Sequence, residues 1–435
     1  VDVDKARLAS RLAEYFDPLV TDEHIRRTAP DVMRDTGRFA AAAVRAHLLK
    51  RGLLKDNVVR YCYRPFDARW LYWEPETKLL DEKRSEYFPH VFDGNAFLFT
   101  TGRTRKSVTE PPLFTNLLND LNCMDSGARG FPLYLRDAVP ALLRQDPEDQ
   151  RTKNLSQGAV EYLTSTGANE HALFYHCLAL IHSTGYRSSN AGGLRSDWPR
   201  IPLPKTKDAL ERSAELGRHA AALLDTERPV PTVTSGKKRR ELEAIAIVSR
   251  AGGGTLNPAS GDLDITAGWG HAGKDRVTMP GKGKLIERDY TAEELDAIRS
   301  GTEELGLTFE QAMQCLGERT NDIYLNGTAF WKNVPACVWT YTIGGYQVMK
   351  KWLSYREKEL LGRGLTKEEA REVMEMARRI GALLLMEPAL DANYLAIKES
   401  VFDWQALKAG SPKRDKEGQK HTDCGDRPSD AVEPT

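Results

Sequence analysis

Basic side chains gather in short, glycine-bearing segments of a chain whose formal net charge is zero. The 435 residues include 62 Lys and Arg and 62 Asp and Glu. Residues 97–108 carry three basic side chains and no acidic one, residues 182–206 carry four against one, and residues 265–288 carry five against two. Glycine lets a backbone approach an anion closely, and Arg and Lys bind phosphate oxygens. The pattern favours contact with phosphate at chosen points over indiscriminate binding by a uniformly basic protein.

These segments supply the residues that could read a nucleic-acid duplex. Reading base edges takes Arg, Lys, Asn or Gln on loops or helix ends, and further cations hold phosphates. The candidates are Arg103, Arg105 and Lys106 in the first segment, Arg187, Ser188, Asn190 and Arg195 in the second, and Lys274, Arg276, Lys282 and Lys284 in the third. Each segment could instead be a solvated face, and its sequence does not decide between the two.

A further basic pair lies in the window 338–363, which reads VWTYTIGGYQVMKKWLSYREKELLGR. Gly344 and Gly345 permit a turn that a Cβ would hinder. Beyond the turn, side chains recur at steps of three and four, as on one face of a helix: Tyr346, Met349, Lys350, Leu353 and Arg356. We predict a glycine turn followed by a helix that carries Lys350, Lys351 and Arg356. The alternative is an aromatic wedge of the core with a solvated basic edge.

One carboxylate pattern imitates a metal-dependent nuclease. Asp67 is followed by Asp81 and, two residues later, by Lys83. Carboxylates could hold Mg²⁺, and a lysine could stand near the attacking water. Acid-x-Lys triplets arise easily by chance, however, and Asp67 in an aromatic strand is expected to pair with Arg64 or Arg69. A divalent-metal nuclease therefore stays as the alternative function from the enzyme class.

Other catalytic signatures are missing from the sequence. No glycine-rich phosphate loop for ATP is present. The tetrapeptide with which N6-adenine methyltransferases hold the target amine is absent too, since Asn257-Pro258 is followed by Ala259. His171 and His176 are five residues apart, whereas two metal ligands on the same face of a helix are three or four residues apart. We expect no catalytic residue, no metal site and no cofactor in this chain by itself.

Five segments in a fixed order carry a resemblance to a known family. They are YRPFDARWLYW at 63–73, GFPLYL at 130–135, DWPRIPLP at 197–204, TAGWGHAGKDRVTMPGKGK at 266–284, and the window at 338–363. The set resembles the C-terminal target-recognition (specificity) region of the single-chain Type ISP restriction–modification enzymes. The resemblance covers most of the chain, from about Arg7 to about Tyr394.

The resemblance implies a role and a set of partners. In that family the region follows an N6-adenine methyltransferase domain, with a nuclease and a helicase-like motor upstream. The implied function is sequence-specific recognition of double-stranded DNA, which presents the target adenine to a methyltransferase domain outside this chain. S-adenosylmethionine, ATP and Mg²⁺ would serve the parent enzyme. A coupling scaffold that barely touches DNA is the third alternative.

Periodicity and turn signals predict an α+β fold with short sheets, a β-rich part in the second half and a helical C-terminal part. Apolar spacing predicts helices at 4–17, 39–54, 171–183 and 207–224, and two capping boxes open helices at Thr291 and Thr366. Strands are expected at 95–101 and, around a turn, at 58–73. The segment 185–193 is expected to be a loop, and Gly301 to lie beyond the end of its helix.

Composition completes the expectations for organisation and location. The domains are placed at 1–228, 229–345 and 346–407, with a disordered tail at 408–435. The sequence contains no run of 18 apolar residues, so no membrane span is predicted. Its six cysteines form no C-x-x-C pair, which suggests reduced thiols in the cytoplasm. The first residue is Val1 rather than methionine, which suggests a fragment or a processed product.

Overall fold

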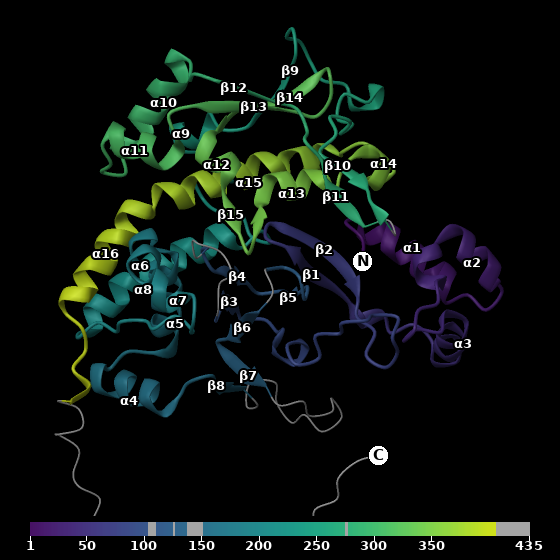
Figure 1. Cartoon of the computed structure of the whole chain (residues 1–435), viewed down its shortest axis with the longest axis horizontal. Helices are drawn as coiled ribbons and strands as arrows, with labels where there is room; N and C mark the ends of the chain where they lie inside the picture. The colour runs from purple at the N-terminus through teal and green to yellow at the C-terminus, as the bar shows by residue number, and fades with distance from the viewer. Residues whose placement is uncertain (103–109, 125–126, 137–150, 275–276, 406–435) are drawn as a thin grey trace, which may run out of the picture.

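The computed structural model describes residues 1–102, 110–124, 127–136, 151–274 and 277–405. Within them the chain has the predicted α+β fold, with several small sheets and a helical C-terminal part (Figure 1). The predicted tail at 408–435 lies outside the described residues. Short 3₁₀ helices occur at Pro30–Met33, Lys55–Asn57, Phe88–His90 and Pro258–Ser260.

Three helices form a small unit at one edge of the molecule: α1 (Lys5–Tyr15), α2 (Asp22–Thr28) and α3 (Ala41–Arg51) (Figure 1). Asp4 begins α1 because its carboxylate accepts the backbone N–H groups of the first turn. The helices predicted at 4–17 and 39–54 are confirmed, with ends that differ by a few residues. Asp2 exchanges backbone hydrogen bonds with Trp70, which fixes this unit to the nearest sheet.

Two three-stranded sheets follow. The first has the order β2–β1–β5, from β1 (Val58–Arg64), β2 (Asp67–Tyr72) and β5 (Leu118–Asn119). The second has the order β4–β3–β6, from β3 (Phe97–Thr101), β4 (Leu113–Thr115) and β6 (Ala128–Pro132). A two-stranded pair joins β7 (Tyr134–Arg136) to β8 (Arg151–Lys153). The predicted strand–turn–strand at 58–73 and the strand at 95–101 are confirmed.

Five helices follow, and they lie beside the second sheet and the β7–β8 pair (Figure 1): α4 (Gln157–Thr166), α5 (Glu170–His182), α6 (Thr184–Ser189), α7 (Ala191–Leu194) and α8 (Lys207–Leu224). α5 and α8 pack closely, because a Cβ at Gly217 would lie 1.8 Å from the carbonyl oxygen of Tyr175. The helices predicted at 171–183 and 207–224 are confirmed. The loop predicted at 185–193 is wrong, since the chain there forms α6 and α7.

The second half builds a four-stranded antiparallel sheet of order β12–β13–β14–β9. Its strands are β9 (Ile247–Arg250), β12 (Leu285–Arg288), β13 (Thr320–Tyr324) and β14 (Ala329–Pro335). A separate hairpin joins β10 (Gly270–Ala272) to β11 (Thr278–Pro280). Helices α9 (Arg240–Glu243), α10 (Ala292–Glu303) and α11 (Phe309–Leu316) lie beside the sheet (Figure 1).

The capping box predicted at Thr291 is confirmed, but α10 continues past Gly301 to Glu303. A Cβ at Gly301 would lie 1.9 Å from a carboxylate oxygen of Glu241. Glycine is needed there for close packing against α9, and not to end the helix.

The C-terminal part links the two halves. It comprises α12 (Ala336–Thr340), the pair β15 (Thr342–Ile343) and β16 (Tyr346–Gln347), α13 (Val348–Ser354), α14 (Lys358–Leu361), α15 (Lys367–Leu385) and α16 (Glu387–Glu399). α15 opens with the predicted capping box at Thr366 and runs between the four-stranded sheet and the helices of the first half (Figure 1). Arg379 on α15 donates to the carbonyl oxygens of Ala222 and Asp225, both at 2.8 Å.

One hydrophobic core runs through the described residues from Tyr61 to Ile397 and crosses both predicted domain boundaries. The divisions at 228 and 345 therefore stay predictions. The segment Lys367–Glu399 is long and apolar enough to cross a membrane by length and composition alone, but half of its most apolar window is buried in the protein. Its first part is α15, which serves as a core helix.

Candidate functional site: a cation–tyrosine cluster

The β1–β2 hairpin brings one half of the site into place. Phe66 takes a positive φ of 61° at the turn, and the register pairs Arg64 with Asp67 across it. Tyr63, Arg64 and Arg69 remain partly exposed, whereas Asp67 is 1% exposed.

The β15–β16 hairpin and α13 supply the other half. Gly344 and Gly345 have φ of 58° and 89°, so both turn residues adopt the left-handed region that glycine favours. The turn brings in Tyr346, and α13 then carries Lys351. The predicted glycine turn followed by a helix is confirmed. The predicted place of Arg356 on that helix is wrong, because α13 ends at Ser354 and Arg356 is buried beyond it.

A buried ion pair joins the two halves. The carboxylate of Asp67 lies 2.7 Å from the guanidinium of Arg69 and 2.8 Å from that of Arg356, which is 289 residues away in the chain. Burial alone would raise the pKa of Asp67, but the attraction of Arg356 and Arg69 outweighs it and holds that pKa below its usual range. The expected pairing of Asp67 with Arg69 is confirmed.

Three cations alternate with three tyrosine rings above this ion pair. The guanidinium of Arg69 lies 3.8 Å from the Tyr63 ring and 4.7 Å from the Tyr355 ring. The guanidinium of Arg64 lies 4.2 Å from Tyr63 and 5.4 Å from Tyr346. The ammonium of Lys351 lies 5.4 Å from Tyr346 and 4.7 Å from Tyr355. We call these six residues the cation–tyrosine cluster; they are Tyr63, Arg64, Arg69, Tyr346, Lys351 and Tyr355.

The charges of the cluster are not all neutralised. Arg69 pairs with Asp67, and Arg64 lies 2.8 Å from the carboxylate of Asp120. In the described part of the chain, no carboxylate lies within 4 Å of the Lys351 ammonium. Burial lowers the pKa of Lys351, and the charge of Arg64 lowers it further. The cluster therefore presents an excess positive charge beside aromatic rings, an arrangement that attracts an anion.

The segment 266–284 packs against the same place. The indole N–H of Trp269 donates to the carbonyl oxygen of Tyr324 at 2.8 Å, and its backbone N–H donates to the Glu357 carboxylate. A Cβ at Gly270 would lie 2.0 Å from the carbonyl oxygen of Ser354, at the end of α13. Three of the five sequence segments thus meet at one junction.

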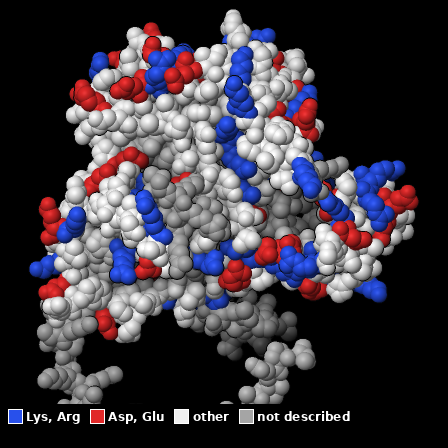
Figure 2. Space-filling model, viewed as in Figure 1, with Lys and Arg blue, Asp and Glu red and all other residues white. Residues whose placement is uncertain are grey.

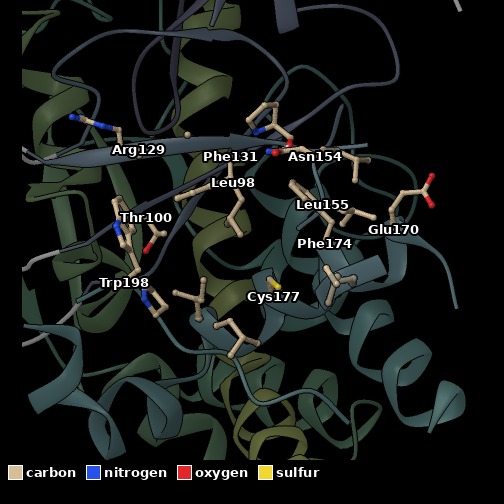
Figure 3. A pocket seen from close by; sticks show the side chains of 18 of the residues that line it. Leu98, Thr100, Arg129, Phe131, Asn154, Leu155, Glu170, Phe174, Cys177 and Trp198 are labelled. Carbon is tan, nitrogen blue, oxygen red and sulfur yellow. Dashed lines mark hydrogen bonds between the residues drawn. The ribbon is translucent and has the colours of Figure 1, made fainter. Parts of the chain in front are cut away.

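The other two segments, 130–135 and 197–204, line a cavity of about 660 Å³ between β6 and α5 (Figure 3). Phe131 and Trp198 meet edge to face at its mouth, with ring centroids 5.3 Å apart. The carboxylate of Glu170 is neutralised by Lys153 at 2.9 Å, and burial raises the pKa of the Cys177 thiol to about 12. The cavity offers apolar contact, and no activated nucleophile lies among these lining residues.

The predicted candidates fall into three groups. Arg103, Arg105, Lys106 and Arg276 lie outside the described residues. Ser188, Arg195, Lys274, Lys282 and Lys284 are exposed, and Lys350 and Lys351 are partly exposed. In Figure 2, Lys and Arg side chains form a broken column from the four-stranded sheet past the β10–β11 hairpin toward β1 and β2.

Arg187 and Asn190 form the third group, because both turn toward the protein. Arg187 donates to the carbonyl oxygens of Ile181 and His182 and to the hydroxyl of Thr184. Asn190 donates to the carbonyl oxygen of Tyr186. Arg187 thus links α6 to the end of α5, and Asn190 also donates to the hydroxyl of Tyr394 on the C-terminal helix. The expectation that both are presented on an exposed loop is wrong.

The residues of the nuclease alternative are not gathered. Asp67 binds two arginines. The Lys83 ammonium donates to the carbonyl oxygen of Pro75 at 2.6 Å, and the exposed Asp81 lies 3.7 Å from Arg38. Among the described residues, no group of three or more His, Cys, Asp and Glu could hold a metal ion.

Comparison with known proteins gave one family and several structures. The model of the Type ISP C-terminal specificity domain matches residues 2–380. No curated protein sequence is significantly similar. Among solved structures, a nuclease-deletion mutant of the Type ISP enzyme LlaGI with a DNA substrate mimic is 16% identical, with a TM-score of 0.48 over 89% of this chain. The DrdV–DNA complex is 17% identical, with a TM-score of 0.47 over 89%.

The ATP-dependent Type ISP enzyme LlaBIII bound to DNA is 13% identical, with a TM-score of 0.49 over 90% of this chain. The chain covers 30%, 33% and 22% of the LlaGI, DrdV and LlaBIII chains, so it spans about a third of their length or less.

Proposed function

Because the chain belongs to the Type ISP C-terminal specificity domain family, we propose that it recognises a specific site in duplex DNA for a restriction–modification enzyme. The observation that carries the proposal is the cation–tyrosine cluster. Lys351 offers a charge that no carboxylate neutralises in the described residues, and two tyrosine rings lie beside it. Phosphate contacts of this kind fix the register of a protein on a duplex, while other side chains read the bases.

The proposed role within the parent enzyme is to present a target adenine to an N6-adenine methyltransferase domain outside this chain. An extruded base leaves a gap, and the specificity region helps to hold the distorted duplex. S-adenosylmethionine, ATP and Mg²⁺ would be used by the methyltransferase, motor and nuclease of the parent chain. The site of action is the cytoplasm, where the DNA lies.

We propose that the chain by itself is catalytically inert. Both carboxylate oxygens of Asp67 accept hydrogen bonds from arginine, so they do not offer a metal site. With Mg²⁺, ATP and S-adenosylmethionine supplied, we expect no DNA cleavage, ATP hydrolysis or methyl transfer. Nicking of duplex DNA that disappears on combining Asp81→Ala with Lys83→Ala would overturn this proposal.

Selection of bound fragments from a random duplex pool tests recognition directly. A short common sequence among the bound fragments is the expected result. If about six phosphates are contacted, affinity for that sequence should fall roughly a thousandfold between 50 and 200 mM salt. Absence of binding at low salt would overturn the proposal and favour a coupling scaffold.

A further inference from the structure

The β10–β11 hairpin exposes two apolar side chains, one in its second strand and one just before it. Val277 is 59% exposed and Met279 is 46% exposed. Side chains two residues apart along a strand lie on the same face, so Val277 and Met279 form one exposed apolar pair.

The base of the hairpin is held rigidly on the core. Trp269 is fully buried directly before β10. A Cβ at Gly281 would lie 2.1 Å from the carbonyl oxygen of Gly268, and a Cβ at Gly283 would lie 2.0 Å from the Trp269 ring. Two glycines after β11 thus let the returning strand press against the core. A ribbon fixed in this way loses little conformational entropy when it binds.

Lysines flank the exposed apolar pair. Lys274 follows β10, and Lys282 follows β11; both are exposed. Lys284 lies with its ammonium 4.2 Å from the Tyr324 ring. None of the three has a carboxylate within ion-pair distance among the described residues. The described part of the hairpin therefore joins an exposed apolar pair to a positive rim.

This combination fits duplex DNA better than a protein face. A protein interface typically buries about 800 Å² on each partner, whereas here two apolar side chains stand among lysines that have no carboxylate partner in the described residues. The major groove is about 12 Å wide and admits a two-stranded ribbon, with phosphates along both edges. The apolar group that it offers is the 5-methyl group of thymine.

We propose that the β10–β11 hairpin enters the major groove, where Val277 and Met279 contact thymine methyl groups and Lys274 and Lys282 contact the flanking phosphates. This inference rests on the proposed function, because it names the element that reads the bases. In this proposal, Val277 and Met279 read the base sequence, although neither is among the polar and basic candidates predicted from the sequence.

The test compares sequence selection by Met279→Ala and Val277→Ala with that of the unaltered chain. The variants should lose a preference for thymine at one or two neighbouring positions. In the selected site, replacing that thymine by uracil should weaken binding by the unaltered chain about fourfold, as expected for one buried methyl group. The same replacement should leave the affinity of Met279→Ala or Val277→Ala unchanged.

Two matched variants separate the roles. Ile286→Ala removes an equally exposed apolar side chain from β12, away from the hairpin, and should keep the complete selected sequence. Lys282→Gln should weaken binding to all sequences and lower the salt slope by about one unit, while it keeps the preference for thymine over uracil.

The outcomes distinguish this inference from the proposed function. If the chain binds a specific sequence but Met279→Ala and Val277→Ala select that same sequence, the inference is wrong and the proposed function stands. A changed preference at a base other than thymine overturns the assignment to the methyl group. If the unaltered chain selects no sequence, both proposals fail.

Discussion

A substitution at Lys351 should change DNA binding without changing the stability of the fold. Its ammonium contacts two tyrosine rings and pairs with no carboxylate in the described part of the chain. Lys351→Gln should leave thermal unfolding nearly unchanged. Affinity should fall about equally for all DNA sequences, and the slope of log affinity against log salt should fall by about one unit. Fluorescence anisotropy at several salt concentrations measures both effects.

The matched control is Lys207→Gln, because Lys207 is exposed at the start of α8, away from the cluster. It should bind as the unaltered chain does. If Lys351→Gln keeps the original salt slope, the cluster does not contact a phosphate.

Glu170 predicts a dependence of stability on pH. Burial alone would raise its pKa, but hydrogen bonds from Lys153 and Tyr134 lower the pKa to about 2. Because the folded pKa lies below the ordinary value of about 4.3, this carboxylate stabilises the fold above pH 4.3, and the stabilisation is lost as pH falls toward 2. Urea unfolding at pH 5 and pH 3 measures how much the free energy of unfolding falls between these pH values. The fall should be smaller for Glu170→Gln than for the unaltered chain. Equal losses of stability in the two proteins would show that the lowered pKa of Glu170 does not stabilise the fold.

Single residues also show where sequence reasoning ended. The pairing of Asp67 with Arg69 could be predicted because the two lie on one strand with a spacing of two. The second partner, Arg356, could not, since the contact depends on how distant elements pack. For the same reason Tyr63, Arg64, Arg69 and Tyr355 were missing from the predicted site, although YRPFDARWLYW contains two Arg and two Tyr residues.

At the scale of elements, local signals gave correct predictions. The capping boxes at Thr291 and Thr366 begin helices as expected, because each box is closed by side chains three residues apart. The segment 185–193 misled because its Gly, Ser and Asn residues are typical of loops. Its helix begins where the Ser183 hydroxyl caps it, and Asp391, more than 200 residues away, accepts the backbone N–H of Gly185.

The β15–β16 turn gives a prediction about elements. Gly344→Ala should destabilise the protein for two reasons: the positive φ, which costs about 1–2 kcal/mol, and a Cβ only 2.7 Å from the Cα of Met124. Gly362→Ala, at a φ of 79° with open space around it, carries only the first cost. Urea unfolding should therefore rank Gly344→Ala as clearly less stable than Gly362→Ala. Equal stabilities would show that the turn is not pressed against Met124.

The whole molecule should unfold as one unit. The core extends from Tyr61 to Ile397, and Arg379 on α15 is bonded to the carbonyl oxygens at the end of α8. A fragment of residues 1–228 would lose Arg356 as the partner of Asp67, which leaves a buried carboxylate with one arginine. We expect this fragment to show no cooperative thermal transition by circular dichroism. A sigmoidal transition like that of the complete chain would confirm the predicted boundary at 228 instead.

The glycines that clamp the β10–β11 hairpin also bear on how such a protein can change over generations. Gly270, Gly281 and Gly283 make their contacts through the backbone and a buried ring, so the base of the hairpin does not depend on the side chain at Val277, whereas Met279 packs over Gly273. Substitutions at Val277 are then nearly free of a folding penalty. If Val277 contacts DNA as proposed, a lineage could exchange this residue repeatedly and acquire new sites while it keeps the scaffold, and a protein engineer could follow the same route.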